Sequence, residues 1–203
     1  MKTINIKTKW SDVTVKEWVI ISSILSSEFF EIEEKLEKIA LLLSDLTIEE
    51  LINLKVNDYS KIINKVSFVM KEPEKTPILK SIKVAGRSFD VDTNLNEVVT
   101  GQYYMAQNIM KQEDEVFDKI KKILGVYIRP KGKSWGEFDY EENVEFLYNN
   151  LTIDVGYSAG VFFYHIANKY MIASQTCLEK MKKQELKQKK IQKNPVHSTK
   201  PGD

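Results

Sequence analysis

A pattern that starts helices recurs along the chain, and it constrains the fold more than any other feature of the sequence. It is the capping-box spacing, a Thr or Asp followed three residues later by Glu, and it occurs as Thr14 with Glu17, Thr47 with Glu50, and Asp139 with Glu142. In a capping box each of the two residues satisfies a backbone N–H that the first helical turn leaves without a partner. Apolar residues at three- and four-residue steps follow each pair, so the sequence predicts a mainly helical protein.

The same apolar spacing predicts where the individual helices lie. The expected helices cover residues 14–25, 28–44, 47–54, 57–70, 96–111, 114–124 and 139–148. Asn57 or Asp58 is the expected N-cap of the fourth, and Gly125 is the expected C-cap of the sixth. Short stretches between them contain the residues that end helices, such as Pro73.

Residues 80–92 change to a two-residue period. Apolar residues alternate on either side of Ala85-Gly86, namely Ile82, Val84, Phe89 and Val91, which predicts a β-hairpin. The alternation from Ile4 to Lys7 predicts a short edge strand, and residues 126–130 read as an extended stretch closed by Pro130. The predicted fold class is mainly α, a multi-helix bundle with one inserted β-hairpin at about 80–92 and a long C-terminal helix.

The most apolar helix is predicted late in the chain, from about Val155 to Tyr170. It contains Gly156, Ala159 and Gly160, small residues that let a neighbouring helix approach closely, so we expect it to pack at the centre. The helical pattern continues through Cys177 and Leu178 into a Lys-rich end, and beyond Pro195 there is nothing to bury. We therefore predict one helical domain over residues 1–178, followed over 179–203 by a Lys-rich helix extension and a disordered tail.

Composition narrows the classes of function. The 203 residues carry 30 Lys and Arg against 29 Asp and Glu, a formal charge of +1, so no global field draws the chain to nucleic acid or to a membrane. The single cysteine, Cys177, excludes an internal disulfide. No apolar run reaches the roughly 20 residues that span a bilayer, and the first residues lack the apolar core of a secretion signal. We expect a protein with no membrane contact that is made and used inside a cell.

No pattern in the sequence predicts catalysis, and we expect no cofactor, no metal and no enzymatic activity. The two histidines are far apart in the chain, and His165 is expected to be a packed, hydrogen-bonded imidazole in an apolar helix. The run Lys131-Gly132-Lys133-Ser134 lacks the upstream glycine of a phosphate-binding loop. The carboxylate runs are typical of solvated helix faces and helix starts.

The C-terminal lysines form the main charge asymmetry. Five of them are candidates for contact with nucleic acid: Lys182, Lys183, Lys187, Lys189 and Lys190. Each lysine that neutralises a phosphate adds a salt-sensitive contribution to binding, but no aromatic residues are interleaved to stack on bases. The other interpretation is a solvated helix end whose lysines suit the negative pole of the helix dipole. Both interpretations stay open.

Three stretches resemble a known group of proteins. They are Trp10-Ser11-Asp12-Val13-Thr14-Val15-Lys16-Glu17-Trp18, Thr100-Gly101-Gln102-Tyr103-Tyr104 and Val161-Phe162-Phe163. Their order is similar to that in small helical proteins encoded among the tail and virion genes of bacteriophages, including crAss-like and other phages of Bacteroidetes hosts, and to tail assembly chaperones. The resemblance implies a virion component or a chaperone that shields a partner during assembly, and no catalytic residues. The long Lys-rich end departs from a typical chaperone.

The predicted function is bacteriophage morphogenesis through protein–protein contacts, in the virion or the cytoplasm of the infected bacterial host. The expected partners are other phage structural proteins, with weak nucleic-acid contact through the C-terminal lysines and the chain itself as a further partner in a homo-oligomer. Tyr103, Tyr104 and Tyr164 are the candidate contact residues, because aromatic side chains concentrate binding energy at interfaces, while Phe162 and Phe163 are assigned to the core. The alternatives are a nucleic-acid-associated packaging or cargo protein and a small enzyme of unfamiliar type. The identity of the partner and the copy number stay open.

Overall fold

The computed structural model describes residues 4–94 and 97–167, and every structural statement below concerns that part of the chain. It confirms a mainly helical fold with a small antiparallel sheet. The helices are α1 (Val15–Ser26), α2 (Ile32–Leu42), α3 (Ile48–Ile52), α4 (Val56–Val66), α5 (Thr100–Lys111), α6 (Val116–Tyr127) and α7 (Tyr140–Asn150). There are also two short 3₁₀ helices, η1 (Trp10–Asp12) before α1 and η2 (Ser67–Met70) after α4, and residues 153–167 are helical as well.

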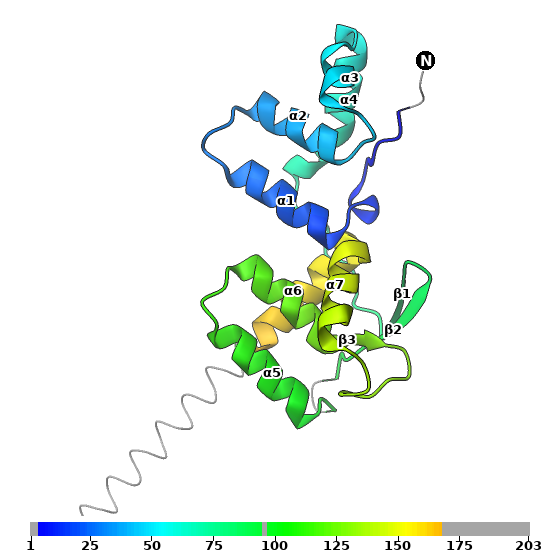
Figure 1. Ribbon diagram of the computed structural model, residues 1–203, viewed down its shortest axis with the longest axis vertical. Coiled ribbons are helices and arrows are strands. Elements are labelled where there is room, and N and C mark those ends of the chain that lie inside the picture. Colours follow the sequence, from blue (N-terminus) through cyan, green and yellow to red (C-terminus); the bar gives the residue numbers. More distant parts are fainter. Residues whose placement is uncertain (1–3, 95–96, 168–203) are drawn as a thin grey trace, which may run out of the picture.

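The helices gather into two groups along the long axis of the molecule (Figure 1). The first group contains α1 to α4, and the second contains α5 to α7, the sheet and the helix of residues 153–167. Backbone hydrogen bonds join the groups, because Val15 N donates to Leu151 O at 2.9 Å and Ile153 N donates to Val13 O at 2.7 Å. Buried apolar residues of both groups belong to one continuous core.

Two of the predicted capping boxes are complete. At the start of α1, Glu17 N donates to Thr14 Oγ1 at 3.3 Å and Thr14 N donates to Glu17 Oε2 at 2.9 Å. Thr47 and Glu50 make the same pair of bonds at the start of α3. Asp139 makes half of its box: it accepts from Glu142 N at 2.9 Å, while the Glu142 carboxylate lies 3.9 Å from Arg87. The local sequence therefore determines where these helices begin.

Several predicted helix ends are wrong. The second helix starts at Ile32 rather than at residue 28, because Glu31 is its N-cap and Glu31 N donates to Glu34 Oε2. The fourth starts at Val56 after Lys55, so Asn57 and Asp58 lie inside it and cap nothing. The helix expected over residues 96–111 begins at Thr100.

Gly125 is not the C-cap of α6, which continues to Tyr127. A Cβ at Gly125 would overlap Val144 Cγ2 of α7 and would lie 3.4 Å from Val144 Cα. The glycine is therefore required by the close approach of two helices, a tertiary contact that leaves no local signal in the sequence.

The predicted hairpin is present. Strands β1 (Ser81–Val84) and β2 (Arg87–Val91) pair antiparallel around Ala85 and Gly86, whose φ values of 45° and 80° suit a two-residue hairpin turn. A third strand, β3 (Ile128–Pro130), pairs antiparallel with β2 and gives the order β1-β2-β3. Only the second half of the predicted extended stretch is a strand, because residues 126–127 belong to α6. The edge strand predicted at Ile4–Lys7 is wrong: Ile6 forms one isolated bridge with Ser44.

The late apolar helix, predicted to pack at the centre of the fold, contacts α1 and α6 and buries Ala159, Phe163 and Ala167. Gly156 faces Val15 and Leu151, and Gly160 faces Ile120 of α6, where a Cβ would lie 2.8 Å from Ile120 Cγ2. Phe163 is fully buried and stacks on Tyr127 with ring centroids 4.5 Å apart. The predicted continuation through Cys177 and the tail over 179–203 lie outside the described residues. Within the described part of the chain, none of the helices combines the length and the apolarity needed to cross a bilayer.

Candidate functional site

The three tyrosines predicted as contact residues come from two helices. Tyr103 and Tyr104 lie on α5 with their rings edge to face at 5.7 Å, and Tyr164 lies on the helix of residues 153–167. Tyr104 is 59% exposed, whereas Tyr103 and Tyr164 are half-buried. The Gln107 amide donates to Tyr103 Oη at 2.7 Å. Tyr104 is therefore the tyrosine of the three that is best placed to contact a partner.

The core assignment of the neighbouring phenylalanines is correct for one of them. Phe163 is fully buried, but Phe162 is 37% exposed. His165 is exposed as well, so the prediction of a packed imidazole is wrong. The reason is geometric. His165 follows Phe163 by two residues, which corresponds to about 200° of rotation in an α-helix, so His165 lies on the side opposite the buried Phe163. The candidate nucleic-acid lysines, Lys182 to Lys190, lie outside the described residues.

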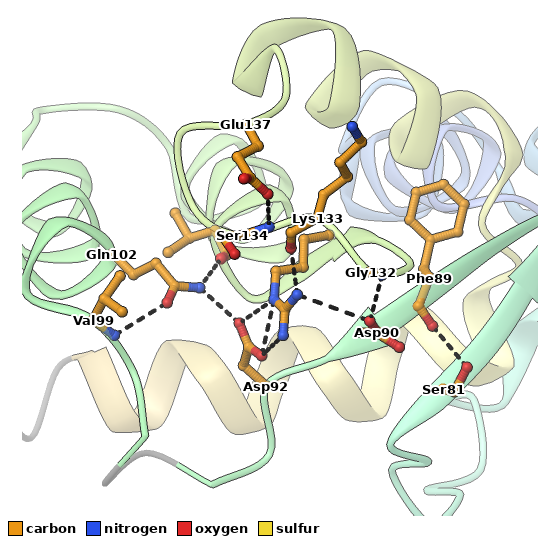
Figure 2. Close-up of polar contacts among 12 residues, drawn as sticks. Ser81, Phe89, Asp90, Asp92, Val99, Gln102, Gly132, Lys133, Ser134 and Glu137 are labelled. Atoms are coloured by element: carbon orange, nitrogen blue, oxygen red, sulfur yellow. Dashed lines mark hydrogen bonds and ion pairs between the residues drawn. The ribbon is translucent and has the colours of Figure 1, made fainter.

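A polar network holds the first turn of α5 against α6 and the sheet (Figure 2). Gln102 is 3% exposed. Its amide nitrogen donates to Asp92 Oδ2 at 2.7 Å and to Val126 O at 2.9 Å, and its amide oxygen accepts from Val99 N at 3.3 Å. Because these bonds hold Gln102 in place, they also fix the orientation of the next two residues of α5, Tyr103 and Tyr104.

Arg129 connects this network to the loop after β3 through its contacts with Asp92 and Lys133, both of which are labelled in Figure 2. Its guanidinium binds both carboxylate oxygens of Asp92 at 3.1–3.2 Å and donates to Lys133 O. Asp90 lies 3.8 Å from Arg129 Nη1 and accepts from Gly132 N at 2.9 Å. The carboxylates therefore have partners, and their arrangement indicates support of the loop rather than acid–base chemistry.

The loop of residues 131–134 is not arranged to bind phosphate. A phosphate cradle needs backbone N–H groups that point at the ligand. Here Gly132 N donates to Asp90, and Ser134 N donates to Glu137 Oε2 at 2.6 Å, so these amides serve the fold. Among the described residues, no group of three or more His, Cys, Asp and Glu side chains is placed to hold a metal ion.

A concave surface lies between α2, α3 and α4, and we call it the α2–α4 groove. It encloses about 480 Å³. Its apolar lining includes Phe30, Leu41, Ile48, Ile52 and Val56, and Glu34, Glu37 and Lys38 also line it. All of these residues come from the first group of helices, at the end of the molecule away from α5 (Figure 1).

Three aliphatic side chains of the groove are strongly exposed. The exposed fraction is 66% for Ile48, 75% for Ile52 and 78% for Val56. Helix α3 has five residues, of which only Leu51 is buried, so Ile48 and Ile52 share the face of this short helix that the core does not cover. Apolar residues gathered in this way on one surface mark a contact site more often than isolated exposed ones do.

The surroundings of the groove are strongly acidic. Residues 28–59 contain nine Asp and Glu but three Lys, a formal charge of −6. Glu37 accepts from Tyr59 Oη at 2.7 Å, and this hydrogen bond raises the pKa of Tyr59 to about 12. Lys38 Nζ lies 4.3 Å from the centre of the Phe30 ring and covers one wall. The groove therefore combines an apolar floor with a negative rim.

Sequence reasoning did not identify this groove. In this region Leu51 and Ile62 are buried, whereas Ile48, Ile52 and Val56 are strongly exposed although they are equally apolar. A short helix cannot bury both of its sides unless a neighbour covers each of them, and only tertiary structure reveals which side stays open.

No protein-family model, curated protein or solved structure matches this chain.

Proposed function

We propose that this protein is a non-enzymatic assembly factor that acts through protein–protein contacts. In this proposal the α2–α4 groove receives a basic protein segment that carries apolar side chains. The observation behind it is the coincidence of exposed Ile48, Ile52 and Val56 with a region of formal charge −6. Apolar side chains of the partner match the floor, and its lysines or arginines match the rim.

The apolar floor supplies most of the expected affinity. Full burial of an aliphatic side chain is worth about 1.5–3 kcal/mol. Because Val56 is 78% exposed in the free protein, covering it recovers about 1–2 kcal/mol, and covering Ile52 recovers a similar amount. Exposed carboxylates add roughly 0.2–1 kcal/mol per ion pair. Their main effect is to favour a positively charged partner and to increase its rate of association.

Three synthetic peptides of equal length test the chemistry of the occupant. One repeats Leu-Lys-Lys-Leu, the second repeats Leu-Glu-Glu-Leu, and the third repeats Ser-Lys-Lys-Ser. The proposal predicts that the full chain binds the first, with an affinity that falls as salt rises, and binds the other two much more weakly. Equal binding of the first and third peptides would contradict it, because charge alone would then suffice.

A pair of matched variants tests the location. Val56 is the first residue of α4, and Val116 is the first residue of α6 and is 52% exposed. Aspartate suits the first turn of a helix, so neither Val56→Asp nor Val116→Asp should unfold the protein. We expect Val56→Asp to weaken binding of the Leu-Lys-Lys-Leu peptide at least about tenfold, equivalent to about 1.4 kcal/mol, and Val116→Asp to leave it unchanged. Equal effects of the two variants would remove the groove as the site.

We propose bacteriophage morphogenesis as the setting, either as a resident virion protein or as a transient tail assembly chaperone. The support is the resemblance of the three stretches at residues 10–18, 100–104 and 161–163 to phage virion and tail-region proteins. Mass spectrometry of purified virions and of infected-cell lysate tests this setting. Stoichiometric presence in virions supports a structural role, and abundance confined to the lysate supports a chaperone. Absence from both would refute the phage setting.

A nucleic-acid-associated packaging or cargo role is the second candidate. It is favoured by the composition of residues 168–203, which contain nine Lys against three Asp and Glu. It predicts DNA binding by the full chain with a steep dependence on salt, which Lys182→Glu, Lys183→Glu and Lys187→Glu together abolish. If the triple variant bound DNA as well as the unchanged chain does, this role would be abandoned.

A further inference from the structure

The occupant of the groove can be identified more closely from the charge distribution along the chain. Residues 28–59 have a formal charge of −6, and residues 168–203, with nine Lys against three Asp and Glu, have a formal charge of +6. The formal net charge of the chain is only +1 although it contains two segments of equal and opposite charge. Such a distribution favours contact between the two segments.

The basic segment also contains the apolar residues that the groove requires. Within residues 179–193 there are seven Lys against two Glu. Met181, Leu186 and Ile191 are spaced among them at five-residue steps. This segment therefore has both properties that the groove requires of a partner, which are basic side chains for the negative rim and apolar side chains for the floor.

We propose that residues 179–193 of a second copy of this chain occupy the α2–α4 groove, so that copies associate head to tail. This inference rests on the proposed function of the groove. It goes further by naming the partner and by fixing the geometry of the assembly.

The direction of the helix of residues 153–167 favours a second copy over the same chain. This helix starts against α1, where Gly156 faces Val15, and continues past α6, where Phe163 stacks on Tyr127. It ends in the half of the molecule that contains α5, away from α3 and α4 (Figure 1). At residue 167, where the described part of this helix ends, the helix therefore points away from the groove of its own molecule.

The two contact surfaces are different, and this determines the type of assembly. A contact between a groove on one copy and a segment of another is heterologous, so each copy keeps one free groove and one free segment. Repetition of the contact gives a ring if the rotation closes and an open filament if it does not. Growth beyond a dimer therefore distinguishes this assembly from a two-fold symmetric dimer.

Two full-length variants with complementary defects test the inference. The groove variant carries Ile52→Gln and Val56→Asp, and the tail variant carries Lys182→Glu, Lys183→Glu and Lys187→Glu. In sedimentation velocity the unchanged chain should increase in mass beyond a dimer as its concentration rises. Each variant alone should remain monomeric. An equimolar mixture should form a 1:1 dimer that does not grow, because one intact groove and one intact tail remain in it.

Matched controls separate loss of contact from loss of fold. Val116→Asp and the charge-conserving set Lys182→Arg, Lys183→Arg and Lys187→Arg should associate as the unchanged chain does. Circular dichroism of every variant should show unchanged helix content.

Three outcomes would overturn the inference. The first is a tail variant that associates as strongly as the unchanged chain. The second is a mixture of the two variants that stays monomeric while the unchanged chain associates. The third is an unchanged chain that is monomeric at every concentration. In that case, tighter binding of the Leu-Lys-Lys-Leu peptide by the tail variant than by the unchanged chain would show that the tail of the same molecule occupies the groove. Binding of that peptide to the groove without self-association would leave the proposed function standing and refute only the second-copy partner.

Discussion

Replacing Gln102 with methionine should lower the free energy of unfolding by about 2–4 kcal/mol, although methionine has nearly the same length and volume. Gln102 is 3% exposed and makes three hydrogen bonds. The carbonyl of Val126 lies in the last turn of α6, where carbonyls have no partner within the helix. Leaving it without the Gln102 amide costs about 1–3 kcal/mol, and loss of the cap on Val99 N costs about 1 kcal/mol. Asp92 contributes little to this loss because Arg129 still binds it.

Urea denaturation of the two proteins, with equal m-values required, measures the difference. Gln102→Glu is an informative companion. It keeps an acceptor for Val99 N but brings a carboxylate to the position from which the amide donates to Asp92 at 2.7 Å. The loss in free energy of unfolding caused by Gln102→Glu should therefore be greatest at neutral pH. This loss should become smaller as the pH falls and the introduced carboxyl becomes protonated. A change below about 0.5 kcal/mol for Gln102→Met, the range of ordinary surface substitutions, would refute the assignment of the network as a support of α5.

Three further predictions concern other parts of the molecule. Gly125→Ala should lower the free energy of unfolding, because the overlap with Val144 costs about 1–3 kcal/mol and helix propensity returns up to about 1 kcal/mol; an increase measured in urea would contradict the close approach of α6 and α7. Tyr104→Ala should leave the melting temperature unchanged and reduce assembly if the tyrosine is a contact residue, whereas a lowered melting temperature alone would remove it from the contact surface. Spectrophotometric titration should show a pKa of about 12 for Tyr59, and this pKa should return towards 10 in Glu37→Gln. Because the pKa is raised in the folded state, the stability that this hydrogen bond contributes should be fully present below pH 10. It should be lost as the pH rises towards 12.

The parts of the fold that the sequence predicted depend on local interactions. Thr14 and Thr47 start helices because their partners lie three residues away, and the turn at Ala85-Gly86 lies between two short alternating runs. Gly125 shows the limit of this reasoning. A glycine near a helix end has the pattern of a C-cap, and only the position of Val144, nineteen residues later in the chain, shows that it serves helix packing.

The candidate site was predictable only in part, for the same reason. Tyr103, Tyr104 and Tyr164 were expected to contact partners; of these three, Tyr104 is exposed, and its role as a contact residue stays a prediction. His165 was misjudged because the apolar residues around it did not reveal which face of the helix is buried. The α2–α4 groove was missed because Ile48, Ile52 and Val56 are ordinary helix residues in sequence. Their exposure follows from how α2, α3 and α4 are arranged, which no local pattern encodes.

The central claim is that the α2–α4 groove is the surface that binds a basic segment carrying apolar side chains, and mapping a bound peptide onto the full chain tests it most directly. Backbone amide chemical shifts of the isotopically labelled protein would be followed during titration with the Leu-Lys-Lys-Leu peptide. Shifts concentrated in residues 30–59, with α5 unaffected, are the predicted result. Shifts concentrated on α5 around Tyr104, or an absence of shifts at saturating peptide, would contradict the claim.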